Sequence, residues 1–224
     1  MLFRSLIEKL LKTEGEFTHP DLNTRGIEIK DLKEGDYIAR EGRSPSKISI
    51  LLKGTVYVTT FSTKGDRIIS HTMEGVQFFC IMETIQRLKY NLASVVALTD
   101  VKVLEIDAPL YIKELEEDKL LSQMTIDYLC DFSVNMIREF NKINSYSIEE
   151  NMLSYFYYLA KDKELPFELK EKRTFYADLF KINVRTFYRY LNEWEEKNYI
   201  VRERQKLYIT KESLKNLKKE IALL

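Results

Sequence analysis

The sequence predicts an α+β protein in which an N-terminal roll of short strands is followed by a long helix and a smaller C-terminal unit. Between about Gly26 and Asp107, short runs rich in Ile, Val, Tyr and Thr are separated by Gly and Asp, a pattern typical of antiparallel strands. From Pro109 onward, apolar residues recur at three- and four-residue steps, which is typical of helices. Hydrophobic residues make up 45% of the 224 and charged residues 31%, which suffices for a globular core.

Four runs in the first region are the clearest strand candidates. They are KISILL (47–52), TVYVTTF (55–61), RIISHTM (67–73) and NLASVVAL (91–98). The second run alternates apolar and polar residues, so it buries one face only. Gly65 can supply the positive φ of a hairpin turn between the second and third runs. Short strands at this spacing favour a sandwich, jelly roll or barrel over a parallel α/β sheet.

The helical region begins with a short helix near Pro109, because proline suits a first helical turn. Residues 119–145 contain no Gly or Pro and predict one helix about 40 Å long at 1.5 Å per residue. Helices of this length usually cross between domains or pack against a copy of themselves. The alternative is a helix that lies on its own core. Its apolar stripe comprises Leu121, Met124, Tyr128, Leu129, Phe132, Met136, Phe140 and Ile143.

A boundary is predicted near residues 145–148. Ser147 and Glu150 have the spacing of a capping box, in which the serine caps a helix and the glutamate reaches back to the backbone. Three parts are therefore predicted. Residues 1–108 form the N-terminal helix and the roll, residues 109–146 form the short and long helices, and residues 147–224 form the C-terminal unit.

The last part has the layout of a winged helix-turn-helix. A short helix over 175–182 follows Thr174, a good N-cap, and Asn183 can cap a second helix that ends at Lys197 or Asn198. Residues 199–210 predict two short strands around a polar turn, and a final helix follows. Short helix, tight turn, longer helix and β-hairpin is the arrangement that places the second helix in a DNA major groove.

The second helix separates an apolar face from a polar one. Phe187, Tyr190, Leu191 and Trp194 form the apolar face, which leaves Arg185, Thr186, Tyr188 and Arg189 outward. Arginine can donate two hydrogen bonds to guanine, whereas threonine and tyrosine suit phosphates or thymine methyls. The predicted DNA-contact set is Thr174, Asn183, Val184, Arg185, Thr186, Tyr188, Arg189, Arg202, Arg204 and Lys206.

Charge supports this interpretation only locally. The whole chain has a formal net charge of zero, so a polyanionic partner must be met by a local cluster. Residues 181–208 carry seven cations and four acids, and three of the acids, Glu193, Glu195 and Glu196, lie at the far end of the helix. Arg202, Arg204 and Lys206 place a basic cluster in the hairpin, where phosphate contact is expected.

The segments EGDYIAREG (34–42), ISILLKGTVYV (48–58) and VRTFYRYLNEWEEKNYI (184–200) resemble the Crp/Fnr family of bacterial transcription regulators over nearly the entire chain. Gly35, Gly42 and Gly54 fall at that family's turn positions. The resemblance implies a cyclic-nucleotide-binding-like roll, a homodimer joined along the long helix, double-stranded DNA with a pseudo-palindromic site, and contact with RNA polymerase. The dimer residues would be Leu121, Met124, Tyr128, Phe132, Met136 and Ile143.

By the same resemblance, Arg185 and Arg189 fall where family members carry a glutamate and an arginine that read bases. Val184 falls where many carry another arginine. These differences imply an operator sequence that is not inherited from the family.

The predicted effector region differs from the family's cyclic-AMP cassette. Cys80-Ile81 replaces Gly-Glu, and Asn91-Leu92 replaces Arg-Ser, so the groups for ribose and phosphate are missing. Cyclic AMP is therefore not expected. The apolar segment around Met82 leaves an apolar effector, a peptide-like effector and no effector all open.

No cofactor is predicted. An iron–sulfur cluster of the family's kind is excluded because no cysteine precedes Cys80. Haem has only His19 and His71 as candidate axial ligands. Cys80 and Cys130 are either a redox pair or small buried hydrophobic residues.

Other classes of protein are disfavoured. The sequence has no phosphate-binding loop, no metal-spaced His/Cys cluster and no Ser-His-Asp set, so an enzyme is not expected. The N-terminal segment lacks the apolar core of a signal peptide, and no apolar run approaches a membrane span, which predicts a cytoplasmic protein. The alternative is an interaction or sensing module whose winged helix contacts protein.

Overall fold

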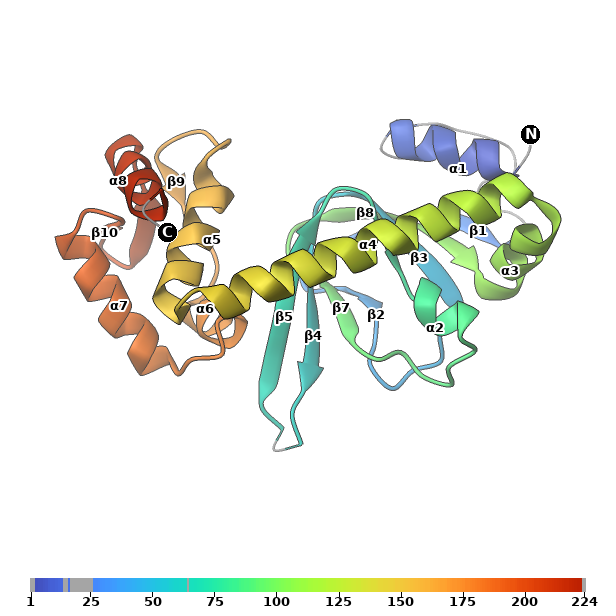
Figure 1. Cartoon of the computed structure of the whole chain (residues 1–224), viewed down its shortest axis with the longest axis horizontal. Coiled ribbons are helices and arrows are strands. Elements are labelled where there is room, and N and C mark those ends of the chain that lie inside the picture. The colour runs from blue at the N-terminus through green and yellow to red at the C-terminus, as the bar shows by residue number, and fades with distance from the viewer. Residues whose placement is uncertain (1–2, 14–15, 17–25, 64, 223–224) are drawn as a thin grey trace. The chain divides into compact units, whose positions relative to one another are not determined.

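The computed structural model describes residues 3–13, 16, 26–63 and 65–222, with the backbone alone at 142–144. The chain forms two compact units, Met1–Cys130 and Asp131–Leu224. Helix α4 contributes residues to both (Figure 1).

The first unit is an antiparallel roll of two four-stranded sheets, in the orders β1-β8-β3-β6 and β2-β7-β4-β5 (Figure 1). This confirms the predicted roll. Its elements are α1 (Phe3–Lys12), β1 (Ile27–Leu32), β2 (Tyr37–Ala39), β3 (Lys47–Lys53), β4 (Thr55–Phe61), β5 (Arg67–Glu74), β6 (Gln77–Phe79), α2 (Ile81–Ile85), β7 (Ser94–Ala97), β8 (Val101–Asp107), α3 (Ala108–Glu117) and the start of α4 (Lys119–Ser145).

Two apolar layers hold this unit together. One lies between the sheets and includes Leu51 and Val103. The other covers the outer face of the first sheet, where Ile48 and Ile50 pack against residues of α1, α3 and α4. Strand β3 serves both layers because successive side chains point to opposite faces, so all five residues between its terminal lysines are buried.

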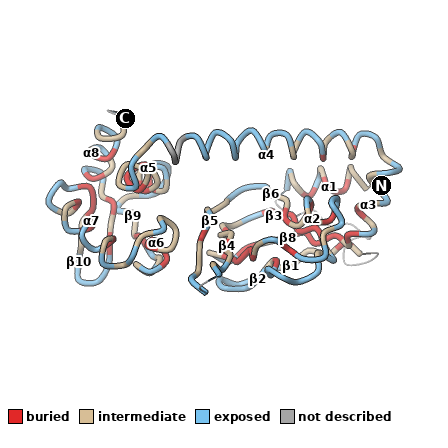
Figure 2. Tube along the Cα trace, turned by 60° about the horizontal axis from the view of Figure 1, so that its bottom comes forward, coloured by how far each residue is buried: buried red, intermediate tan, exposed pale blue. Residues whose placement is uncertain are grey.

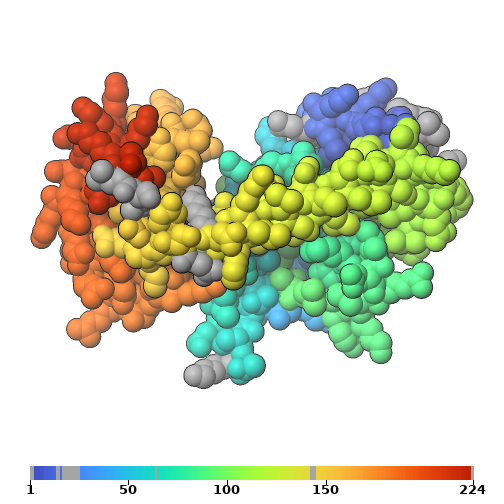
Figure 3. Space-filling view, viewed as in Figure 1, coloured from blue at the N-terminus to red at the C-terminus, as the bar shows by residue number. Residues whose placement is uncertain are grey.

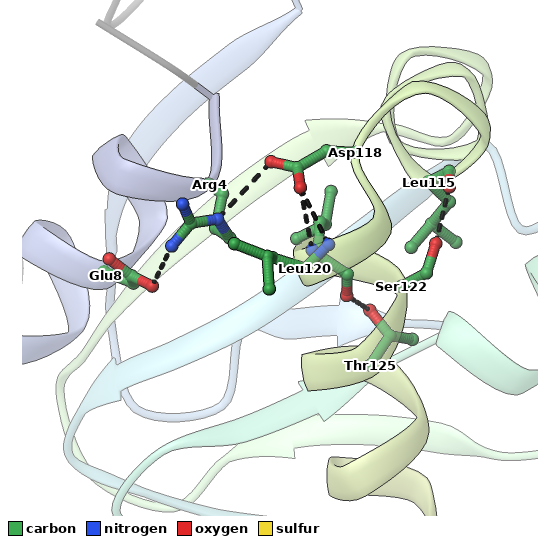
Figure 4. A network of polar contacts seen from close by, with 8 residues as sticks. Arg4, Glu8, Leu115, Asp118, Leu120, Ser122 and Thr125 are labelled. Carbon is green, nitrogen blue, oxygen red and sulfur yellow. Dashed lines mark hydrogen bonds and ion pairs between the residues drawn. The ribbon is translucent and has the colours of Figure 1, made fainter.

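A polar network fixes the junction between α3 and α4 (Figure 4). The Asp118 carboxylate accepts the backbone N–H groups of Leu120 and Leu121 at 2.9 and 3.2 Å, and so caps the first turn of α4. The same carboxylate lies 3.4 Å from the Arg4 guanidinium of α1, whose other nitrogen donates to Glu8 at 2.7 Å. The N-terminal helix and the long helix are thereby joined at one carboxylate.

The second unit combines helices with a three-stranded sheet in the order β10-β11-β9. Its core is aromatic: Phe156 has ring contacts with Tyr155, Tyr176, Phe180 and Trp194. Besides the end of α4, its elements are α5 (Ile148–Ala160), β9 (Phe167–Glu168), α6 (Arg173–Leu179), α7 (Val184–Glu196), β10 (Val201–Glu203), β11 (Lys206–Ile209) and α8 (Lys211–Ile221).

Most predicted boundaries agree with the structure. The capping box of Ser147 and Glu150 is present, Asn183 caps α7, and α4 spans residues 119–145 as expected. The N-cap at Thr174 is wrong: α6 begins at Arg173, two residues before the predicted start at 175, and its N-cap Lys172 forms no side-chain cap bond.

The strand predicted over 91–98 is shorter, because β7 begins only at Ser94. The backbone of Asn91 instead bonds to the turn after β2, accepting from Gly42 and donating to the carbonyl oxygen of Arg43. Position 91 therefore belongs to a loop contact and not to the sheet.

Gly54, at the β3–β4 turn, is predicted to tolerate a side chain least among the turn glycines of the roll. It has φ +96°, and a Cβ there would lie 2.5 Å from the carbonyl oxygen of Asp100. Gly42 also has positive φ, +74°, but a Cβ there meets nothing within 4 Å. Gly42→Ala should therefore cost about 1–2 kcal/mol for the left-handed backbone alone, and Gly54→Ala clearly more.

Urea denaturation followed by far-ultraviolet circular dichroism measures the difference. Fluorescence of Trp194, the single tryptophan, reports on the second unit and should be unchanged by either substitution. Equal losses for the two variants would contradict the steric argument.

Candidate functional site

Helix α7 is anchored through its apolar face and its N-cap. Phe187, Leu191 and Trp194 are each no more than 1% exposed, and the indole N–H of Trp194 donates to Glu149 of α5 at 3.0 Å. The Asn183 side-chain oxygen accepts the backbone N–H of Thr186 at 2.7 Å. The opposite face of the first two turns is therefore held outward.

That outward face carries two arginines with weak or no intramolecular pairing. Arg185 is exposed and forms no hydrogen bond or ion pair with any residue that the structure describes. Arg189 has a side chain 65% exposed, and its closest carboxylate, Glu193, is 3.9 Å away. Tyr188 between them is exposed, whereas Val184 and Thr186 are half-buried. Of the predicted contact residues on α7, the two arginines and Tyr188 are the most accessible.

The hairpin of β10 and β11 carries one free cation and two engaged ones. Arg202 donates to Asn192 of α7 at 2.9 Å and lies 3.5 Å from Glu195, so it ties the hairpin to α7. Lys206 is 3.0 Å from Glu168 of β9. Arg204 is exposed at the tip, and within the described part of the chain its side chain has no partner.

The backbone at the hairpin tip is strained. Glu203 pairs with Lys206, which leaves Arg204 and Gln205 as a two-residue turn, and Arg204 has φ +56°. Glycine and asparagine are the usual residues in this left-handed conformation, and arginine there costs about 1 kcal/mol or more. A side chain retained at such a cost is a candidate for function.

Arg173 is a residue that sequence reasoning missed. Its guanidinium donates to the carbonyl oxygen of Gln205 at 2.5 Å, so it connects α6 to the tip of the hairpin. The two positions are 32 residues apart, and no local pattern reports such a contact. Its neighbour Thr174 is exposed in the first turn of α6.

Part of the predicted dimer stripe on α4 is wrong. Leu121 is 2% exposed within the core of the roll, and the Tyr128 hydroxyl accepts the backbone N–H of Phe78 at 2.9 Å. Leu121 is therefore not available to a second copy, and the half-buried Tyr128 bonds to its own chain. Met124 and Phe132 are half-buried and Met136 is exposed, whereas the side chain of Ile143 lies outside the described residues.

A different apolar stripe on α4 is exposed. Ile126, Val134 and Ile137 are 53%, 43% and 61% exposed, and Cys130 is exposed among them. Steps of four, four and three residues place all four on one side of the helix. Figure 2 shows α4 exposed along most of its length, and in Figure 3 its atoms (yellow) form a band on the surface.

Comparison with known proteins supports this architecture. Residues 29–118 match the family model described as the cyclic nucleotide-binding domain. A CRP-family transcriptional regulator from Thermus thermophilus has a TM-score of 0.71 at 14% identity, over 86% of this chain and 96% of that one. The c-di-GMP-responsive global regulator CLP from Xanthomonas campestris has a TM-score of 0.70 at 11% identity. The match covers 92% of this chain and 99% of that one.

The chain has the Crp/Fnr fold. A further CRP/FNR-family regulator from Thermus thermophilus has a TM-score of 0.62 at 18% identity. The match covers 87% of this chain and 98% of that one. No curated protein matches the sequence.

Within the Crp/Fnr fold of this chain, the predicted effector region divides into buried and exposed residues. Ile81 and Asn91 are buried, whereas Met82 and Leu92 are 43% and 64% exposed. Cys80 has φ +62° and precedes α2. These residues therefore do not share one surface.

The two cysteines are both free, and only Cys130 is exposed. Burial raises the pKa of the Cys80 thiol to about 12, so the thiolate that a redox switch needs is disfavoured at neutral pH. Cys80 is half-buried and packs against the layer between the sheets.

Two further observations concern the described residues only. They contain no group of three or more His, Cys, Asp or Glu side chains placed to hold a metal ion. Among them, no helix has the length and apolar character needed to cross a membrane.

Proposed function

We propose that the chain is a homodimeric, sequence-specific DNA-binding transcription regulator. The observation that carries the proposal is the outward face of α7, where Arg185 and Arg189 stand without a strong intramolecular partner. The hairpin beside this helix adds a third such cation, Arg204.

The roles of these residues follow from their positions. Arg185 and Arg189 lie in the first two turns of α7, one turn apart, where a helix in the major groove meets base edges. Arg202 and Lys206 already have intramolecular partners, so their part is to hold the hairpin, whereas Arg204 extends to a phosphate.

A second copy of the chain is the proposed partner of the exposed stripe on α4. Covering Ile126, Val134 and Ile137 with the same residues of a twofold-related helix removes apolar surface from water. Twofold symmetry also presents two α7 helices to a pseudo-palindromic site. This dimer face replaces the one first predicted.

Arg189→Ala is expected to weaken binding to the selected DNA site by about 1–3 kcal/mol and to relax discrimination at one base pair. The site is first obtained by selection from random duplex DNA, and affinities are then measured on single-base variants. Lys215→Ala, which removes an exposed cation of α8, is the control and should leave discrimination intact. Uniform weakening across all sequences would show that Arg189 contacts phosphate. If the chain retained no DNA, or retained DNA independently of salt concentration, a winged helix that contacts protein would be favoured instead.

Arg204→Gly should separate stability from binding. Glycine relieves the left-handed strain, so the free energy of unfolding should stay level or rise by up to about 1 kcal/mol. DNA binding should weaken alike for all sequences. The slope of the logarithm of the binding constant against the logarithm of salt concentration should fall in magnitude by about one. Arg202→Gly, which breaks the tie to Asn192, should instead lower stability. Base-selective loss in Arg204→Gly would contradict the phosphate role.

Ile137→Glu is expected to convert the dimer to monomers, because it places a charge in the proposed apolar contact. Asn135→Glu is the matched control, since it adds the same charge about 200° around the helix. Both residues are exposed in the single chain, so neither change should unfold it. Analytical ultracentrifugation gives the oligomeric state, and dissociation by both variants would argue against this face.

A further inference from the structure

The β-roll contains a cavity of about 360 Å³ whose walls carry an excess of positive charge. Four cations line it, Lys30, Arg40, Arg43 and Lys47, against the single carboxylate of Glu105. The volume is at the lower end of small-molecule sites, which span roughly 300–1,000 Å³.

The two lysines are neutralised within the cavity wall. Each ammonium lies 2.8 Å from the Glu105 carboxylate and 3.6 Å from that of Glu28. Burial opposes ionisation of Glu105, but the hydrogen bonds from both lysines outweigh it and lower the pKa of this carboxyl group. The hydrogen bond to Glu105 likewise raises the pKa of Lys47. This cluster is a balanced set of charges.

The two arginines are not neutralised. The Arg40 guanidinium lies 3.7 Å from the centroid of the Tyr37 ring, which attracts the cation but carries no charge. Arg43 is exposed, and none of the described residues pairs with its side chain. Two positive charges therefore remain uncompensated at one side of the cavity.

Asn91 holds the turn that carries both arginines. Its backbone accepts from Gly42 at 3.0 Å and donates to the Arg43 carbonyl oxygen at 2.8 Å, and its side-chain amide donates to the Arg40 carbonyl oxygen at 3.2 Å. Asn91 is only 7% exposed, and its side-chain oxygen is buried without a hydrogen-bond partner among the described residues. The three hydrogen bonds of Asn91 thus hold the backbone of this turn in place.

We propose that the cavity binds a small organic anion whose carboxylate or phosphate is held by Arg40 and Arg43. Asn91 holds the backbone of the turn that carries both arginines, and their planar guanidinium groups suit the bidentate geometry of either group. The hydroxyl groups of Ser44, Ser46 and Ser49 line the same cavity and suit polar substituents of the ligand. As an effector site this deepens the proposed function and rests on it, whereas anion binding itself is tested separately.

The test is thermal unfolding of the full chain titrated with citrate or with glycerol 3-phosphate, with potassium chloride holding the ionic strength constant. Glycerol serves as the uncharged probe. At least one anion should raise the melting temperature saturably, and glycerol should not. Citrate alone would identify a carboxylate site, and glycerol 3-phosphate alone a phosphate site.

Arg43→Gln should lower the apparent affinity at least about tenfold, as expected for the loss of a charged hydrogen bond. It should leave the melting temperature without ligand unchanged, because Arg43 has no described side-chain partner. Arg87→Gln, which removes an exposed arginine outside the cavity lining, should bind as the unmodified chain does.

Stabilisation by neither anion, or equal affinity in Arg43→Gln, would overturn the inference. DNA retention is measured on the same preparations without ligand. If the chain binds DNA but neither anion, only the anion-site proposal is refuted. If it binds an anion but no DNA, only the proposed DNA-binding function is refuted.

Discussion

The structure depends on how the beginning of α4 is buried against the roll. Asp118 caps the helix and pairs with Arg4, Leu121 enters the core, and the Tyr128 hydroxyl bonds to the backbone of β6. Together these contacts set the rotation of the helix about its own axis. The same rotation decides which side chains of the helix stay exposed as far as Cys130, where the first unit ends. The exposure of Ile126, in the turn next to Leu121, is a consequence of this packing.

The same logic governs the second unit. Phe187, Leu191 and Trp194 are buried in an aromatic core, and Trp194 is also bonded to Glu149. Burying that face forces the other one outward, which is where Arg185 and Arg189 lie. The exposed face of α7 is therefore specified by apolar packing behind it, and the arginines contribute little to the fold.

Local signals in the sequence predicted much of this structure and failed where contacts are distant. The ends of α4, the capping box at Ser147 and the N-cap at Asn183 depend on neighbouring residues, and they agree with the structure. Thr174 failed because a good capping residue does not prevent a helix from starting earlier without a side-chain cap.

Periodicity on α4 was ambiguous for a physical reason. The helix has two apolar stripes, and spacing alone does not tell which one meets the roll. Leu121 and Tyr128 were assigned to a second copy, although their own chain buries Leu121 and packs and bonds against Tyr128. The bonds of Arg173 to Gln205 and of Asn91 to the turn at Arg40 join positions 32 and 51 residues apart, so no sequence pattern reports them.

Unpaired surface cations are common, and ion pairs at the surface contribute little to stability, so an unpaired arginine is weak evidence of function. What distinguishes three sites in this chain is that the fold fixes the backbone beneath the free cation. Asn183 caps the turn that carries Arg185, a strained turn bonded to Arg173 carries Arg204, and Asn91 holds the turn of Arg40 and Arg43. Because the backbone beneath each cation is fixed in advance, only the side chain loses conformational entropy when an anion binds, and that advantage exists only in the bound state.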